Sequence, residues 1–296
     1  MSNAYAGSVT NWSKQVISKA LEADFKLEVA DTAGRNHATE LATSAVAEGF
    51  DAVVAFGGDG TINEVAQGLV GTNVALGILP GGSTNVMARS FGLPLSPVDA
   101  TAVVAARLRS GTERRVGVGR IGGRYFLFSA GMGLDGEVVR RVEEDPEGKK
   151  RRGEWLFFVN AIKAGLTQYR GAAPKLTLEV EGEPPARVVT AVCCNARPFT
   201  YFKGRPVDAC PRASLDRRLD MLGFTRLSSW EIPRLAVSLF GSGSHVDWRS
   251  ARYFPDTAAA RMVAEDPLPV QVDGDYVGRF SEADVAYVPQ ALTLLG

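Results

Sequence analysis

Two short apolar runs near the start of the chain each end in a glycine turn, and each is followed by a helical pattern. Residues 51–56 run into Gly57-Gly58, and residues 75–79 run into Pro80-Gly81-Gly82. Short buried runs that alternate with helices indicate β-α-β units and a parallel sheet. Because the carboxyl ends of parallel strands meet at one edge, both turns are expected at the edge where such sheets bind ligands.

The same alternation covers the first part of the chain and then stops near Gly111. A further strand is expected at residues 26–30, and helices are expected at residues 11–24, 36–48, 61–70 and 97–109. This pattern predicts a doubly wound parallel α/β domain at residues 1–112. The C-terminal segment, residues 284–296, is expected to pack back onto it.

Beyond Gly111 the pattern is mainly that of antiparallel strands. Gly122-Gly123 separates two strand patterns, residues 115–121 and 124–129, which predicts a hairpin. Helices are expected at residues 155–169 and 230–239, and further strands at residues 175–181, 187–195, 218–226, 252–254 and 270–273. We therefore predict a β-rich domain at residues 113–283, with the highly charged residues 143–154 as a mobile loop.

Composition excludes several classes of protein. The 296 residues carry 33 Lys plus Arg and 33 Asp plus Glu, and this zero net charge argues against a chain-wide nucleic-acid footprint. The three cysteines, two of them adjacent, form neither a disulfide framework nor a zinc pattern, which favours a reducing cytoplasmic compartment. The longest uncharged stretch, residues 65–88, contains several glycines and Pro80, so no membrane span or signal peptide is expected.

The glycine turns suit phosphate chemistry. Glycines let backbone N–H groups approach a phosphate closely, and the N-terminus of a helix favours negative charge. Asp59 would repel a bare phosphate, so it is expected to act through Mg²⁺ or its waters. An ordinary strand-to-helix turn with an aspartate cap is the alternative. The spacing matches neither the dinucleotide-binding nor the Walker pattern.

Taken together, the two turns resemble the diacylglycerol kinase and sphingosine kinase family of lipid kinases. That family has Gly-Gly-Asp-Gly-Thr, here residues 57–61, followed by Pro-x-Gly-[Ser/Thr]-x-Asn, here residues 80–85. The more distant NAD kinases share only the first motif. Later segments also match: Gly-Met-Gly-Leu-Asp at residues 131–135, the Leu-Asp-x-x-Leu-Asp type at 213–220, and Val-Asp-Gly-Asp-Tyr at 272–276.

The resemblance implies an ATP- and Mg²⁺-dependent transfer to a lipid hydroxyl, with ATP on the first domain and the lipid on the second. It gives Asp275 the role of proton acceptor, supported by Asp273, with Asp59 at the magnesium and a doubtful second magnesium at Asp216. From the residues alone, residues 273–275 are better interpreted as a β-turn between 270–272 and 276–278, which is compatible with an active site. Contact with the nucleotide is implied for thirteen residues: Asn3, Gly7, Gly57, Gly58, Asp59, Gly60, Thr61, Asn63, Glu64, Gly82, Ser83, Thr84 and Asn85.

Four departures from the family pattern bear on these roles. Asp275 is one methylene shorter than the family's glutamate, and Val86 stands where many bacterial members have aspartate. Arg217-Arg218 replaces the usual Asp-Gly, which puts the magnesium at Asp216 in doubt. The family's apolar opening strand and the proline of its first turn are missing, so we expect an exposed sheet edge and lower stability than with about eight further apolar residues upstream.

Alternatives stay open at this point. The acceptor could be a sphingoid base or another lipid alcohol, and a non-catalytic nucleotide- or lipid-binding protein is a different class. Two basic stretches, residues 149–152 and 193–234, suggest contact with anionic lipid at the inner membrane face, and the second holds aromatic residues at 199, 201 and 202. A solvated loop is favoured for the first stretch, and a packed loop is equally consistent with the second.

Overall fold

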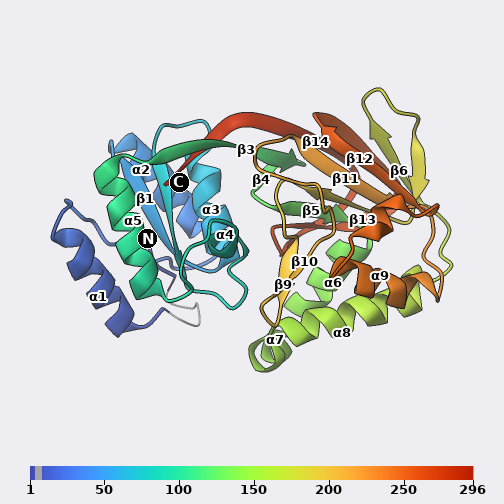
Figure 1. The fold of residues 1–296 in the computed structure, drawn as a ribbon, viewed down its shortest axis with the longest axis horizontal. Helices are drawn as coiled ribbons and strands as arrows, with labels where there is room; N and C mark the ends of the chain where they lie inside the picture. Colours follow the sequence, from blue (N-terminus) through green and yellow to red (C-terminus); the bar gives the residue numbers. More distant parts are fainter. Residues whose placement is uncertain (4–8, 296) are drawn as a thin grey trace. The chain divides into compact units, whose positions relative to one another are not determined.

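The computed structural model describes residues 1–3 and 9–295, and it divides the chain into two compact units (Figure 1). Unit 1 is Met1–Gly117 with Pro289–Gly296, and unit 2 is Val118–Val288. The chain passes from one to the other along two strands, β3 (Glu113–Ile121) and β14 (Asp275–Leu295).

The sheet of unit 1 is parallel. β1 (Ala52–Gly57) pairs with β2 (Ala75–Pro80), with Ala52 opposite Ala75 and Gly57 opposite Pro80. The last residues of β14 pair in parallel with the other edge of β2, through Thr293 and Leu294. The predicted parallel α/β architecture is therefore present, and the in-register strands bring the two glycine turns to the same edge.

Residues 1–3 lie along the edge of β1 that faces away from β2. Ser2 forms a parallel bridge to Phe56 on one side and to Asp31 on the other. The Phe56 N–H donates to the Met1 carbonyl at 2.8 Å, and the Thr32 N–H donates to the Ser2 carbonyl at 2.9 Å. This edge of β1, expected to be exposed, is thus partly covered. The strand predicted at residues 26–30 does not form, because pairing begins only at Asp31.

Helices cover both faces of this sheet. Phe56 and Leu79 share a core cluster with Ile17 of α1 and Val104 of α5. Val53, like other side chains on the opposite face, is also buried, on the side that α3 contacts. This burial on both faces is what a doubly wound sheet requires. The helices are α1 (Asn11–Glu22), α2 (His37–Ala47), α3 (Asp59–Leu69), α4 (Val86–Ser90) and α5 (Pro97–Ser110).

Unit 2 is built on an antiparallel sheet with strand order β14-β13-β5-β8-β11-β12. β6 pairs with β13, β7 with β6, and β4 with β3, while a separate hairpin joins β9 to β10. The bounds are β4 Arg124–Phe126, β5 Ser129–Met132, β6 Leu176–Val180, β7 Ala186–Val188, β8 Thr190–Cys194, β9 Thr200–Phe202, β10 Arg205–Val207, β11 Leu219–Phe224, β12 Ala251–Thr257 and β13 Ala259–Val272.

The helices of unit 2 correct one prediction. They are α6 (Leu134–Glu143), α7 (Pro146–Arg152), α8 (Glu154–Ala164), the π-helical turn η1 (Gly165–Tyr169), α9 (Glu231–Leu239) and the 3₁₀ turn η2 (Ser244–Asp247). Residues 143–154, predicted as a mobile loop, are mostly helical. Charged residues such as Glu, Lys and Arg are good helix formers, and Pro146 occupies the first helical position, where proline is favoured.

The longest strands were the least visible in the sequence. β13 and β14 form one hairpin that runs from Ala259 to the end of unit 2, whereas the pattern indicates only residues 270–273 and a turn that leads into 276–278. Many side chains of this hairpin are half-exposed or exposed. The hairpin is also irregular, because the pairing of its two strands shifts between Val263 and Leu268 and again after Val270. The turn of this hairpin contains Asp273 and Gly274, directly before Asp275.

The cysteines and the helix lengths can be described directly for this part of the chain. Cys193, Cys194 and Cys210 are free thiols and all three are buried. Burial raises the pKa of the Cys193 thiol well above its usual value. Within residues 1–3 and 9–295, no helix is long and apolar enough to cross a bilayer.

Candidate active site

The two glycine turns of unit 1 touch each other through their backbones. The Gly81 N–H donates to the Gly57 carbonyl at 2.7 Å. A Cβ placed on Gly82 would lie 2.7 Å from the Gly58 Cα, and a Cβ on Gly81 would lie 2.9 Å from the Gly57 Cα. Real Cβ atoms do not approach backbone so closely, so glycine is needed here for the contact between the turns. This requirement exists whether or not a phosphate binds.

Two polar side chains hold the turns in place. Asn85 has a left-handed backbone (φ 49°), and its side chain closes the second turn by accepting from the Gly82 N–H at 2.9 Å and donating to the Gly82 carbonyl at 2.8 Å. Asp59, the first residue of α3, accepts from the Met87 N–H at 3.2 Å. Asp59 therefore connects the first glycine turn to the first turn of α4, and its carboxylate lies where both turns meet.

Thr61 connects the first turn to the start of the chain. Its hydroxyl accepts from the Asn3 side-chain amide at 2.9 Å, and a Cβ on Gly57 would approach the Thr61 side chain to 2.7 Å. Asn3 thus lies beside the first turn of α3, and its contact with a nucleotide stays a prediction. Gly7, the other residue implied from this segment, lies outside the described residues.

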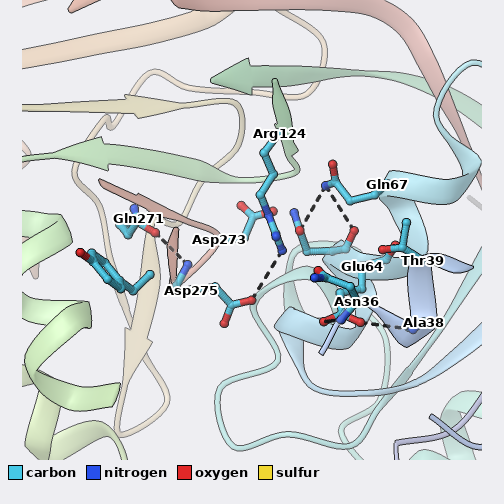
Figure 2. A network of polar contacts seen from close by, with 12 residues as sticks. Asn36, Ala38, Thr39, Glu64, Gln67, Arg124, Gln271, Asp273 and Asp275 are labelled. Atoms are coloured by element: carbon cyan, nitrogen blue, oxygen red, sulfur yellow. Dashed lines mark hydrogen bonds and ion pairs between the residues drawn. The ribbon is translucent and has the colours of Figure 1, made fainter. Parts of the chain in front are cut away.

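Asn63 and Glu64 form contacts within unit 1. The Glu64 carboxylate accepts from the backbone N–H groups of Asn36 at 2.8 Å and Ala38 at 3.3 Å, which lie at the N-terminus of α2 (Figure 2). Asn63 is fully buried, and its side-chain oxygen accepts a hydrogen bond from the Gln67 side-chain amide at 3.2 Å. These contacts show Glu64 joining α2 to α3, and Asn63 paired with Gln67 one turn further along α3.

Fewer residues are accessible at the carboxyl edge of the parallel sheet than the thirteen for which the resemblance implies contact with a nucleotide. Ser83 is exposed, while Gly60 and Thr84 are half-buried. The Thr84 carbonyl accepts from the Arg89 guanidinium at 2.9 Å, so it supports the second turn. The N-terminus of α3 together with the glycine backbone can present N–H groups to an anion. The arrangement can offer these N–H groups to a phosphate chain, with a cation between the phosphates and the Asp59 carboxylate.

The donor set at Asp59 is suited to a magnesium that arrives with a nucleotide. Mg²⁺ in such sites usually keeps several waters and binds one or two carboxylates plus substrate phosphates. In the described part of the chain no three Asp, Glu, His or Cys side chains are grouped to hold a metal by themselves. Asp216 is exposed, and the nearby Arg218 guanidinium pairs instead with Asp256 at 3.0 Å, so the residues there do not fit a metal.

Unit 2 contributes the turn between β13 and β14. Val272 pairs with Asp275, and the two residues between them have left-handed backbones, φ 47° at Asp273 and 82° at Gly274. Such a two-residue turn is the expected hairpin connection. The Asp273 carboxylate is buried and accepts three backbone N–H groups, from Leu127 at 2.7 Å and from residues 128 and 129 at 3.0 Å each.

Asp275 stands on the same turn in a different environment. Its side chain is half-buried, and its carboxylate lies 3.9 Å from the Arg124 guanidinium (Figure 2). Asp273 is therefore a buried anchor for the turn, whereas Asp275 is partly accessible beside a cation. The sequence placed both in one motif and did not distinguish them.

Three further residues position this turn, and none was among the predicted site residues. Gln271 is buried; its carbonyl oxygen accepts from the Gly274 N–H at 2.8 Å, and its amide donates to Asp135 at 2.5 Å. On the other side, the Tyr276 N–H donates to Glu143 at 3.0 Å. Both carboxylates belong to α6. The only signal in the sequence was the matched motif that ends at Asp135.

The environment of Asp135 sets it apart from the exposed carboxylates. Burial raises its pKa to about 6, and the hydrogen bond from Gln271 opposes that rise. A carboxyl group whose pKa is raised by burial next to a functional turn is a common feature of active sites. Its side chain contacts Gln271, and through Gln271 it is linked to the Gly274 N–H of the turn.

The fold and these two groups of residues define a class, a lipid kinase of the diacylglycerol kinase type. Residues 2–121 match the diacylglycerol kinase catalytic domain. Over 267 residues the chain is 31% identical to a diacylglycerol kinase of Mycobacterium tuberculosis (strain CDC 1551 / Oshkosh), covering 87% of this chain and 81% of the relative. The chain belongs to the diacylglycerol kinase family.

Two further comparisons agree with this assignment. The chain is 36% identical over 270 residues to a diacylglycerol kinase of Bacillus subtilis (strain 168), covering 89% of this chain and 84% of that one. A crystal structure of a diacylglycerol kinase-type protein from Bacillus anthracis (strain Sterne) has a TM-score of 0.78 at 22% identity, covering 99% of this chain and 93% of that one. The structural likeness shows the shared fold.

Proposed function

We propose that this lipid kinase transfers the γ-phosphoryl group of ATP to the hydroxyl of diacylglycerol or a similar lipid, with Mg²⁺ as cofactor. The observation that carries the proposal is the pair of abutting glycine turns at the carboxyl edge of the parallel sheet, with Asp59 where they meet. Membership of a kinase family makes a phosphate donor the expected ligand of that edge.

On the donor side, the chain binds and orients the phosphates. Backbone N–H groups at the start of α3 offset their negative charge, since a helix N-terminus carries a partial positive charge. Asp59 would hold the magnesium, which when bound neutralises charge that develops on the transferring phosphoryl group. Ser83, exposed on the second turn, would contact the nucleotide.

On the acceptor side, Asp275 takes the proton of the lipid hydroxyl. The hydroxyl oxygen forms a bond to the γ-phosphorus, the bond from that phosphorus to the bridging oxygen breaks, and ADP leaves. A positioned carboxylate contributes because an alcohol is a weak nucleophile at neutral pH. The Arg124 guanidinium lies 3.9 Å from this carboxylate, and Asp273 fixes the backbone that carries Asp275.

The proposal is tested by following ³²P transfer from [γ-³²P]ATP to a panel of lipids in mixed micelles, containing dioctanoylglycerol, sphingosine and monoacylglycerol. Asp59→Asn and Asp275→Asn are compared with Asp284→Asn, a carboxylate that is 88% exposed on β14. We expect Asp275→Asn to lower kcat at least a hundredfold with ATP binding retained. Asp284→Asn should match the wild type.

The outcomes separate the alternatives. Preferred transfer to sphingosine would replace diacylglycerol by a sphingoid base as the substrate. ATP binding without transfer to any lipid would favour a non-catalytic binding protein. Transfer that is unchanged in both Asp59→Asn and Asp275→Asn would refute the mechanism.

A further inference from the structure

Unit 2 exposes large apolar side chains on two neighbouring helices and nowhere else among its described residues. Exposed fractions range from 37% at Ile162 to 86% at Trp230. Monomeric soluble proteins rarely gather such residues in one place, and a contiguous exposed patch marks an interaction site. The side chains are Trp155, Val159, Ile162 and Leu166 on α8 and η1, and Trp230 and Val237 at and on α9.

The residues on α8 form a stripe along one face. Their spacing of four, three and four residues is that of a single helical face. The opposite side of α8 already packs inside unit 2, through Leu156 and Ala164, which are buried. The inner face of α8 therefore accounts for its place in the fold, and the outer stripe has no such explanation within the described chain.

Aromatic rings join this stripe to the neighbouring elements. The ring of Phe158 on α8 stacks on Phe202 of β9 at 5.0 Å, and Phe202 meets Phe240 at the end of α9 at 5.9 Å. Trp155 lies 5.7 Å from Phe202. Figure 1 shows α8, α9 and the β9–β10 hairpin beside one another in unit 2. We call the exposed surface of these three elements the docking face.

The charges on the docking face are mainly positive. Residues 154–174 contain two bases, Lys163 and Arg170, both exposed, and one acid, Glu154, the first residue of α8. The Lys203 ammonium lies 5.6 Å from the Trp155 ring centroid, at the border of the stripe. The one acid of α9, Glu231, accepts hydrogen bonds from Ser228 and Ser250. An apolar stripe bordered by bases is complementary to a surface that is apolar inside and anionic outside.

We propose that the docking face inserts into the surface of a bilayer that contains anionic phospholipid. The proposal rests on the proposed function, because a lipid substrate lies in such a bilayer. Tryptophan is favoured at the membrane interface, and lysine and arginine beside an apolar face favour anionic headgroups. A second copy of the chain fits less well, since a twofold contact would bring two mainly positive faces together.

The test is flotation of the full chain with vesicles of phosphatidylcholine and phosphatidylglycerol (1:1) or of phosphatidylcholine alone. Val159→Ser/Leu166→Ser removes two side chains of the docking face. Val29→Ser/Leu95→Ser is the matched control, because these residues of unit 1 are 54% and 44% exposed. We expect at least tenfold weaker binding of the first variant to mixed vesicles, and binding within twofold of wild type for the second.

Catalysis gives an independent readout. With water-soluble dihexanoylglycerol, the docking-face variant should retain wild-type kinase activity, while its activity on vesicles falls in step with binding. Vesicle binding that is equal in both variants, or equal on neutral and mixed vesicles, would overturn the proposal. So would a dimer in sedimentation analysis that dissociates in the docking-face variant without any change in vesicle binding. Vesicle binding that depends on the docking face in a protein without kinase activity would support the docking face and contradict the proposed function.

Discussion

Asp273 and Asp275 flank one glycine, yet their substitution is expected to have different effects. Asp273→Asn should lower the stability of the protein, whereas Asp275→Asn should lower its activity and leave stability nearly unchanged. Asp273→Asn keeps the shape of the side chain but replaces one acceptor oxygen by an NH₂ group. If the remaining oxygen takes the position that accepts from Phe128 and Ser129, the NH₂ group faces the Leu127 N–H, now 2.7 Å from a carboxylate oxygen. Two donors then oppose each other in a buried site.

The magnitude follows from the contacts. Loss of one hydrogen bond to a charged group costs about 1.5–3 kcal/mol. The two bonds that remain change from charge-assisted to neutral, which is about half as strong, for a further ~1–2 kcal/mol. We therefore expect Asp273→Asn to lower the free energy of unfolding by about 2.5–5 kcal/mol, a large part of the stability of an ordinary domain.

Asp275→Asn is the matched control for stability. It removes one ion pair at 3.9 Å on a half-buried side chain, which is expected to cost about 1 kcal/mol or less. Urea unfolding followed by fluorescence measures both variants at pH 7, with a common dependence on denaturant. Equal unfolding free energies in the two variants would refute the assignment of Asp273 as the anchor of the turn.

The remaining predictions concern the same two groups of residues. Asp275→Glu, which restores the family's residue, should keep kcat within tenfold of wild type, whereas Asp275→Asn should lose at least a hundredfold; equal losses would exclude a proton-accepting role. Because burial raises the pKa of Asp135 to about 6, its folded form binds the proton more tightly than the unfolded form, so stability falls as pH rises from about 4 to 6. Asp135→Asn should abolish that fall, worth up to about 3 kcal/mol, as seen in urea midpoints across this pH range; an unchanged pH profile would contradict it. Gly82→Ala should lower the unfolding free energy by about 2 kcal/mol or more and weaken ATP binding measured by calorimetry, because its Cβ would lie 2.7 Å from the Gly58 Cα. Gly34→Ala, with open space around it, should leave both unchanged.

Patterns of neighbouring residues predicted the strands, turns and helices of unit 1 well. The strands that were predicted wrongly or only in part depend on pairing with residues far away in the sequence. The glycines after residues 56 and 80 are visible because strand, turn and helix follow each other in the chain. By contrast, the strand expected at residues 26–30 depends on a partner, and only Asp31 finds one, at Ser2. The sequence pattern indicates only a few residues of the β13–β14 hairpin, because its half-exposed strands do not alternate clearly between apolar and polar residues.

The sequence by itself determined the class of fold, the two glycine turns and the motif that contains Asp273 and Asp275. Only the tertiary structure decided what each residue of those motifs does. Glu64 joins α2 to α3, and Asn85 closes a turn, because their partners lie elsewhere in the chain. Asp273 is an anchor and Asp275 is accessible because the N–H groups of residues 127–129 surround only the first. Burial and hydrogen bonding depend on residues distant in sequence, and no local pattern records them.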